Sequence, residues 1–256
     1  MSEPQVLLQE THGPVRLITM PGVPKRGNPI SRAYSRQLLD AIVEAEQAPD
    51  ISAVVLAGAE KYFSVGSDLA ELRTMNAVEA VESDWLEEFD RIALARKPLI
   101  AAVRGHAVGG GFELALSCDI IVAAEDASLA LPETGIGVIA GQGGTQRLIQ
   151  RAGLALATDM ILTGRRISGA EAVQLGVAAR ACPAGEVITT AIEIGKTIAE
   201  RSPASIRFAR EVLRAAGEDQ LRHSMRIERL LASVLLDDTE MKRRVGDFFA
   251  SKQQKS

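Results

Sequence analysis

Short apolar runs alternate with helical patterns along the first part of the chain. Five runs predict strands, at residues 15–20, 53–57, 99–103, 120–124 and 128–131. Apolar spacing predicts helices over 32–47, 78–95 and 111–117. Ser31 is the expected cap of the first helix, and Ser67 or Asp68 of another that follows the loop 58–67. Residues 105–111 are predicted as loop. Strands and helices that alternate in this way indicate an α/β fold.

Beyond residue 143 the pattern becomes mostly helical, and only residues 177–181 still predict a strand. Pro203 follows Ser202 where the first residue of a helix is expected. Between residues 205 and 249 apolar side chains recur at helical spacing, at Leu213, Leu221, Met225, Ile227, Leu230, Leu231, Val234, Leu235, Val245, Phe248 and Phe249. This is much apolar surface for a small helical tail. We therefore expect the tail to dock on the core, on a neighbouring subunit, or on both.

Composition and charge exclude several classes of protein. The chain has 256 residues, 46% of them apolar and 24% charged, which is ordinary for a soluble globular protein. Its net charge of −4 gives no overall attraction to nucleic acid or to anionic lipid. No apolar stretch is long enough to predict a membrane span, and the first residues resemble no targeting signal. Cys118 and Cys182 are the only cysteines, so a reducing, cytoplasmic location is expected.

No common catalytic or nucleotide-binding motif is present. His12, His106 and His223 are scattered and have no metal-ligand spacing, so no metal is expected. There is no GxSxG sequence, and no glycine loop ends in GK[ST]. Residues 141–144 lack the GxGxxG spacing and are interpreted as a tight turn into a helix. The sequence therefore argues against metallohydrolase, serine hydrolase, P-loop and Rossmann functions.

Two glycine-containing junctions between a strand and a helix are the first positive signal. Gly109, Gly110 and Gly111 precede one helix, and the segment 63–69 repeats the design after the strand at 53–57. Helix N-termini offer unpaired N–H groups, so the N–H groups of Ser67 and Gly110 are candidates for gripping a carbonyl oxygen that gains negative charge. The alternative, that the glycines only allow close packing, explains the spacing equally.

Two glutamates are the second signal. Glu113 lies just inside the glycine-opened helix, and Glu133 follows the strand at 128–131. Both have mainly apolar neighbours in sequence, which predicts partial burial. Two buried carboxylates close together raise the pKa of at least one of them, so that one carries a proton while the other accepts one. The alternative is that both are ordinary surface glutamates.

Several segments together resemble the crotonase, or enoyl-CoA hydratase/isomerase, family. They are residues 58–69, 100–125, 131–148, 162–172 and 175–177. The resemblance covers nearly the whole chain. It implies a spiral of ββα units over residues 1–195 and a C-terminal helical trimerisation region over residues 196–256. It also implies an acyl-CoA ligand, a homotrimer or dimer of trimers, and no further cofactor.

Position by position, the resemblance assigns roles to individual residues. It implies backbone oxyanion donors at Ser67 and Gly110 and the two hydratase glutamates at Glu113 and Glu133, with Glu113 activating water and Glu133 protonating C2 of a 2-enoyl-CoA. Further substrate contacts are implied at Ser64, Gly66, Asp68, Leu69, Gly109 and Gly141, and Lys25 and Arg26 are candidates for the CoA phosphates. Residues 69–92, including Leu72, Met75, Trp85, Leu86 and Phe89, are candidates for the acyl pocket, and the alternative is a helix that only packs on the core.

Three positions depart from the family pattern. Ser67 stands where alanine is common, Pro29 where alanine often follows asparagine, and residues 140–142 read Ala-Gly-Gln where Pro-Gly-Ala is frequent. These departures leave the acyl group undefined. Double-bond isomerisation and dehydration of a polar 3-hydroxyacyl-CoA remain alternatives. RNA binding is disfavoured, because the helix at 32–47 carries only Arg32 and Arg36 as basic residues, beside acidic ones.

Overall fold

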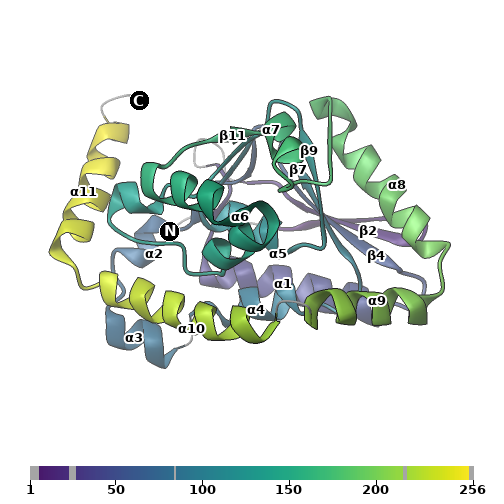
Figure 1. The fold of residues 1–256 in the computed structure, drawn as a ribbon, viewed down its shortest axis with the longest axis horizontal. Coiled ribbons are helices and arrows are strands. Elements are labelled where there is room, and N and C mark those ends of the chain that lie inside the picture. The colour runs from purple at the N-terminus through teal and green to yellow at the C-terminus, as the bar shows by residue number, and fades with distance from the viewer. Residues whose placement is uncertain (1–5, 23–26, 84, 216–217, 254–256) are drawn as a thin grey trace.

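A six-stranded sheet forms the centre of the molecule (Figure 1). The computed structural model describes residues 6–22, 27–83, 85–215 and 218–253. In sheet order the strands are β1 (Leu8–His12), β2 (Val15–Met20), β4 (Ala53–Gly58), β7 (Leu99–Val103), β9 (Ile120–Ala124) and β12 (Arg180–Cys182). Only β1 and β2 pair antiparallel, and the other neighbours are parallel. Continuous apolar runs predicted the central strands because a parallel sheet is buried on both faces.

Shorter strands form two smaller sheets beside the first. The four-stranded sheet has the order β11 (Ile167–Ser168), β10 (Ser128–Ala130), β8 (His106–Val108) and β5 (Tyr62–Ser64). Strands β3 (Pro29–Ile30) and β6 (Gly66–Ser67) pair with each other. The chain places one strand in the large sheet, the next in a smaller sheet, and then forms a helix. This order occurs in β7, β8 and α5 (Gly110–Ser117), and again in β9, β10 and α6 (Gly144–Thr163). The predicted ββα spiral is confirmed.

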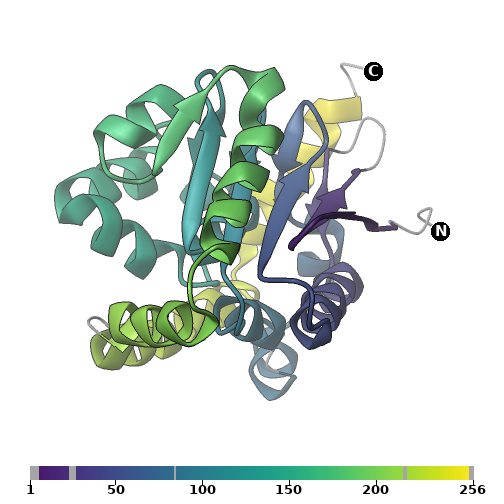
Figure 2. The same cartoon turned by 90° about the vertical axis from the view of Figure 1, so that its right-hand side faces the viewer.

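Helices cover the large sheet. Helix α1 (Arg32–Gln47) begins as predicted, since the Ser31 hydroxyl accepts a hydrogen bond from Tyr34 N at 3.1 Å. Helix α8 (Val187–Ala199) lies along the sheet (Figure 2). It packs closely because Gly195 has no side chain; a Cβ there would meet Val15 at 2.7 Å. Helix α7 (Gly169–Gln174) and the short 3-10 turns η1 (Glu133–Ile136) and η2 (Ala184–Glu186) complete this part.

Three predicted boundaries were wrong. The predicted helix over 78–95 is two helices, α3 (Ala77–Glu82) and α4 (Glu87–Ala93), because the backbone at Leu86 is not helical. The predicted strand over 177–181 begins only at Arg180, because the two residues from Val177 turn back and donate to Ala172 O. The predicted loop 105–111 contains β8, which pairs with β5 and β10. The cap expected at Ser67 or Asp68 is confirmed at Asp68, which begins the short helix α2 (Leu69–Leu72).

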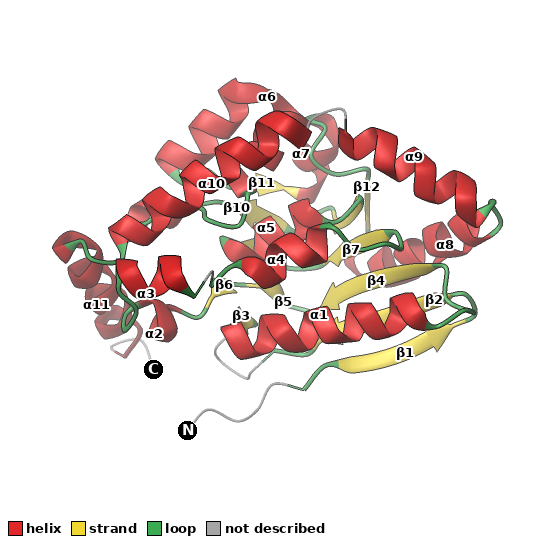
Figure 3. Ribbon diagram, turned by 90° about the horizontal axis from the view of Figure 1, so that it is seen from below, coloured by secondary structure: helices red, strands yellow, loops and turns green. Residues whose placement is uncertain are grey.

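The C-terminal helices dock on the core, as the sequence predicted. They are α9 (Pro203–Ala215), α10 (Glu218–Leu235) and α11 (Thr239–Gln253). Helix α10 lies along α3 and α6 (Figure 3), and α11 packs on η1. Leu236, Met241 and Val245 are buried in one cluster with Leu72 and Val138. The large apolar side chains of this region that stay exposed are Phe208, Val212, Leu213, Ile227, Leu230, Leu231 and Val234. In the described part of the chain, no helix is long and apolar enough to cross a membrane.

Candidate active site

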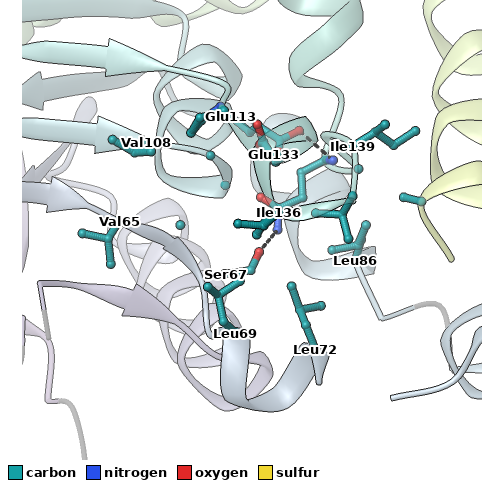
Figure 4. A pocket seen from close by; sticks show the side chains of 18 of the residues that line it. Val65, Ser67, Leu69, Leu72, Leu86, Val108, Glu113, Glu133, Ile136 and Ile139 are labelled. Carbon is teal, nitrogen blue, oxygen red and sulfur yellow. Dashed lines mark hydrogen bonds between the residues drawn. The ribbon is translucent and has the colours of Figure 1, made fainter. Parts of the chain in front are cut away.

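A cavity of about 480 Å³ lies where β6, α5, η1 and α10 meet (Figure 4). Most of its wall is apolar. The apolar lining includes Val65, Leu69, Leu72, Trp85, Leu86, Val108, Ile136, Val138, Ile139, Ala232, Leu236 and Phe248. Glu113 and Glu133 reach into the cavity from two different elements, so the structure brings together the two glutamates that the sequence singled out.

Glu113 is held by backbone amides. It lies in the first turn of α5, whose residues are all buried, and it is itself only 2% exposed. Its Oε1 accepts hydrogen bonds from Gln142 N at 2.8 Å and Gly144 N at 2.9 Å. Burial raises the pKa of Glu113, while these N–H groups and the positive charge of Arg147 act in the opposite direction. The side chain is therefore fixed, and part of the cost of its ionisation is offset.

Glu133 is held quite differently. It is the first residue of η1, after Pro132, and its two carboxylate oxygens are buried without a hydrogen-bond partner among the described residues. Burial raises the pKa of Glu133 well above its usual range, and the nearby charge of Glu113 raises it further. An unpaired carboxylate in such surroundings favours its protonated form. Glu133 is thus suited to carry a proton that it can give away.

A third carboxylate, Glu228 of α10, was missed by the sequence reasoning. It is 5% exposed, and it accepts hydrogen bonds from Gly143 N at 2.9 Å and Thr145 N at 3.3 Å. Glu113 and Glu228 thus bind alternate N–H groups of one turn at the start of α6. Burial raises the pKa of Glu228 to about 8, with the charge of Glu113 as the next cause. A glutamate on an amphipathic helix predicts a solvated side chain, so the sequence carried no signal for this contact.

The predicted oxyanion donors lie side by side. Gly110 begins α5, so its N–H has no acceptor within the helix. The strand β6 pairs with β3 through the N–H of Asp68, which donates to Ile30 O at 3.0 Å, so the N–H of Ser67 faces the other way, towards α5. A Cβ placed on Gly110 would lie 3.2 Å from Ser67 N. Both N–H groups therefore border the same space.

Gly66 makes this close approach possible. Its φ of +92° is one that residues with a side chain rarely adopt, and a Cβ there would meet Gly110 N at 3.0 Å and Val108 O at 2.8 Å. Glycine at this position thus combines a left-handed backbone with contact between β6 and α5. The close packing that was considered as the alternative explanation for the glycines therefore occurs at Gly66.

The other predicted contact residues divide into three groups. Gly66, Leu69, Gly109 and Gly141 line the cavity. Ser64 and Asp68 do not: the Ser64 hydroxyl donates to Asn28 O and accepts from Gly66 N, and the Asp68 carboxylate caps α2. Lys25 and Arg26 lie outside the described residues. Of the pocket candidates, Leu72, Trp85 and Leu86 line the cavity, whereas Met75 and Phe89 lie behind it.

Gln142 is a second residue that the sequence did not assign to the site. It lines the cavity with a side chain only 3% exposed, and its Nε2 donates to Ser67 Oγ at 3.3 Å. The only sequence signal was that Gln142 stands in a segment that departs from the pattern of the resembled family. The side chain thus joins the turn that holds Glu113 to the strand that carries the Ser67 N–H.

The fold and the cavity define a class of protein, and the comparisons with known proteins name its family. A ββα spiral with two carboxylates beside the N-terminus of α5 is the arrangement expected of a crotonase-type protein. The family model for enoyl-CoA hydratase/isomerase matches residues 10–255. The chain belongs to the enoyl-CoA hydratase/isomerase family.

Individual relatives agree with this assignment. A protein named probable enoyl-CoA hydratase from Rhizobium meliloti (strain 1021) is 37% identical over 97% of this chain and 96% of its own length. The mitochondrial enoyl-CoA hydratase of Pongo abelii is 39% identical over 81% of this chain and 72% of its own length. The crystal structure of an enoyl-CoA hydratase/isomerase from Mycobacterium paratuberculosis matches with a TM-score of 0.86 at 27% identity, covering 96% of this chain and 100% of that one.

Proposed function

We propose that this protein is an enoyl-CoA hydratase, which adds water across the double bond of a trans-2-enoyl-CoA to give a 3-hydroxyacyl-CoA. The observation that carries the proposal is the pair of buried carboxylates, Glu113 and Glu133, in one cavity beside the N–H groups of Ser67 and Gly110. Relatives with this name at 37% and 39% identity support it. The substrate class, an acyl-CoA thioester, follows from the family.

In this mechanism the thioester oxygen accepts hydrogen bonds from Ser67 N–H and Gly110 N–H. These donors stabilise the negative charge that develops on the oxygen as water attacks C3, and each such donor contributes about 3 kcal/mol in comparable sites. The two donors lie close together without substrate, because Gly66 has no side chain and β6 can therefore pack against the start of α5.

The two glutamates share the proton transfers. Glu113 takes a proton from water as the water oxygen forms its bond to C3, and the electron pair of the double bond moves towards the thioester. Glu133 then gives its proton to C2. Water has been added in full once the proton on Glu113 returns to Glu133, directly or through solvent. The raised pKa of Glu133 and the amide bonds to Glu113 support this division of roles.

Product analysis tests the proposal. Purified protein is incubated with crotonyl-CoA and with a longer trans-2-enoyl-CoA, loss of the enoyl-thioester ultraviolet absorbance is followed, and the product is weighed by mass spectrometry. Hydration adds the mass of one water. A product of unchanged mass identifies an isomerase instead and contradicts the proposal, as does binding of either substrate without reaction.

A homotrimer or dimer of trimers is proposed as the assembly. The exposed apolar side chains of α9 and α10, such as Phe208, Val212 and Leu213, support it. Sedimentation at several protein concentrations tests the assembly, and a monomer throughout contradicts it.

A further inference from the structure

The cavity contains one hydrogen-bonding atom that nothing in the proposed mechanism uses. Gln142 Oε1 is buried and has no hydrogen-bond partner among the described residues. It lies 2.8 Å from the position of a Cβ placed on Gly110, so it faces the space beside the two proposed oxyanion donors. A buried carbonyl oxygen that has lost water without gaining a partner weakens the fold, and a ligand that supplies the missing donor removes that cost.

Gln142 is held by two hydrogen bonds. Its Nε2 donates to Ser67 Oγ at 3.3 Å, and the backbone N of the same residue donates to Glu113 at 2.8 Å. The side chain is thus tied at both ends, and Oε1 is presented to the cavity by a preorganised residue. Around it the wall is formed by apolar side chains, including Leu69, Leu86 and Val138.

The surroundings restrict the group that pairs with Oε1. A carboxylate on the ligand is disfavoured, because it has no hydrogen to donate to Oε1 and its negative charge would lie near that of Glu113. An ammonium group loses its hydration in a mostly apolar cavity. A hydroxyl group is neutral, small and able to donate, and it therefore fits best.

We propose that Ser67 and Gln142 form a subsite for a hydroxyl group on the acyl chain, so that the protein prefers a 4-hydroxy-2-enoyl-CoA to an unsubstituted 2-enoyl-CoA of equal size. The position on the chain is taken from the proposed mechanism: with the thioester oxygen at Ser67 and Gly110 and with C2 and C3 between the glutamates, C4 is the next carbon. This inference rests on the proposed function and specifies its substrate.

The experiment compares two substrates that differ by one group. In trans-4-hydroxy-2-butenoyl-CoA a hydroxyl replaces the terminal methyl of trans-2-pentenoyl-CoA. The quantity measured is the ratio of kcat/KM for the hydroxylated substrate to kcat/KM for pentenoyl-CoA. We expect this ratio to be about tenfold or more above unity in the wild type and to fall towards unity in Gln142→Met, an apolar side chain of similar length. Ser67→Ala, which frees the amide but keeps the backbone N–H, is expected to lower the ratio by a smaller factor.

The results separate this inference from the proposed function. A wild-type ratio near unity overturns the subsite, and so does a Gln142→Met variant that loses activity equally on both substrates. If neither thioester is hydrated, the proposed function fails, and calorimetric Kd values for the two thioesters then test the subsite alone. Tighter binding of the hydroxylated thioester, lost in Gln142→Met, supports the subsite, and equal Kd values overturn it.

Discussion

The two sides of the cavity hold their carboxylates in opposite ways. On one side, α5, the turn at the start of α6 and α10 surround Glu113 and Glu228, and four backbone N–H groups donate to these two side chains. On the other side, η1 carries Glu133, whose oxygens have no such partner among the described residues. The difference lies in how far burial is offset: burial raises the pKa of all three carboxyl groups, amide donors lower the pKa of Glu113 and Glu228 again in part, and Glu133 has no such donor from another residue.

The largest expected effect is loss of catalysis when either proposed catalytic carboxylate is neutralised. Glu133→Gln and Glu113→Gln are each expected to lower kcat by about 10³-fold with little change in KM. Both variants should fold, because glutamine keeps the shape and, at position 113, an oxygen for the amide donors. The rate is measured with crotonyl-CoA, and circular dichroism is the folding control. A variant with a near wild-type rate removes that residue from its proposed role.

The next effect concerns the two proposed oxyanion donors, the N–H groups of Ser67 and Gly110. Gly110→Ala places a Cβ 2.8 Å from Gln142 Oε1 and 3.2 Å from Ser67 N, so β6 and the start of α5, which carry the two proposed oxyanion donors, must move apart. We expect kcat/KM to fall roughly 100-fold. Gly135→Ala in η1 is the matched control, since a Cβ there meets nothing within 4 Å and should leave the rate unchanged. Equal activity of the two variants would falsify the oxyanion assignment.

The pH dependence of the protein's stability tests the side of the cavity that contains Glu228. The pKa of Glu228 is raised to about 8 in the fold, from an ordinary value of 4.5. The folded state therefore keeps a proton that the unfolded chain has lost, so the contribution of this group to the free energy of unfolding is present below 4.5 and declines as pH rises to about 8. In Glu228→Gln the side chain cannot ionise, so this loss of stability with rising pH does not occur.

We accordingly expect the Tm of Glu228→Gln, relative to wild type, to rise by a few degrees between about pH 5 and about pH 9. The measurement is a set of thermal unfolding curves across this range. At low pH the variant is expected to be no more stable than wild type, because the NH₂ group of glutamine would face one of the two backbone N–H groups that donate to Glu228. A Tm difference that stays constant with pH shows that Glu228 is not titrating in this range.

The smallest expected effect is a change in the pH profile of kcat, which arises because the charge of Glu228 raises the pKa of Glu133. Glu133 must be protonated to act as the acid, so kcat is expected to fall as pH rises through its raised pKa. Burial is the main cause of that pKa, and the charges of Glu113 and then Glu228 add to it. In Glu228→Gln the alkaline limb of the pH profile of kcat should therefore move to lower pH. A limb that does not move, or moves upward, shows that the two sides are not coupled in this way.

Much of the fold could be predicted because its signals are local. The apolar runs that became β2, β4, β7 and β9 are buried on both faces, and the Ser31 cap depends on neighbouring residues alone. The strands of the smaller sheets have two or three residues each. Apart from β10, which its apolar run predicted, such strands are too short to show a periodicity, and they form because neighbouring segments pair with them. This is why β8 was predicted as loop.

The same distinction applies to the site. Glu113 and Glu133 were found because their neighbours in sequence are apolar and because the chain resembles a known family. Glu228 and Gln142 reach the cavity through packing between distant elements, since Glu228 binds an amide 85 residues away and Gln142 binds a hydroxyl 75 residues away. No local pattern marks such contacts. Lys25 and Arg26 lie outside the described residues, so their proposed contacts with the CoA phosphates stay predictions.

The attachment of α10 to the turn at the start of α6 has a consequence for biosynthesis. A growing chain makes β10, η1 and α6 well before Glu228 leaves the ribosome, so the N–H groups of Gly143 and Thr145 are made before the side chain that accepts their hydrogen bonds. The cavity also lacks the wall formed by Ala232 and Leu236 at that stage. The wall around Glu113 and Glu133 is therefore complete only once the last helices of the chain have been synthesised and have docked.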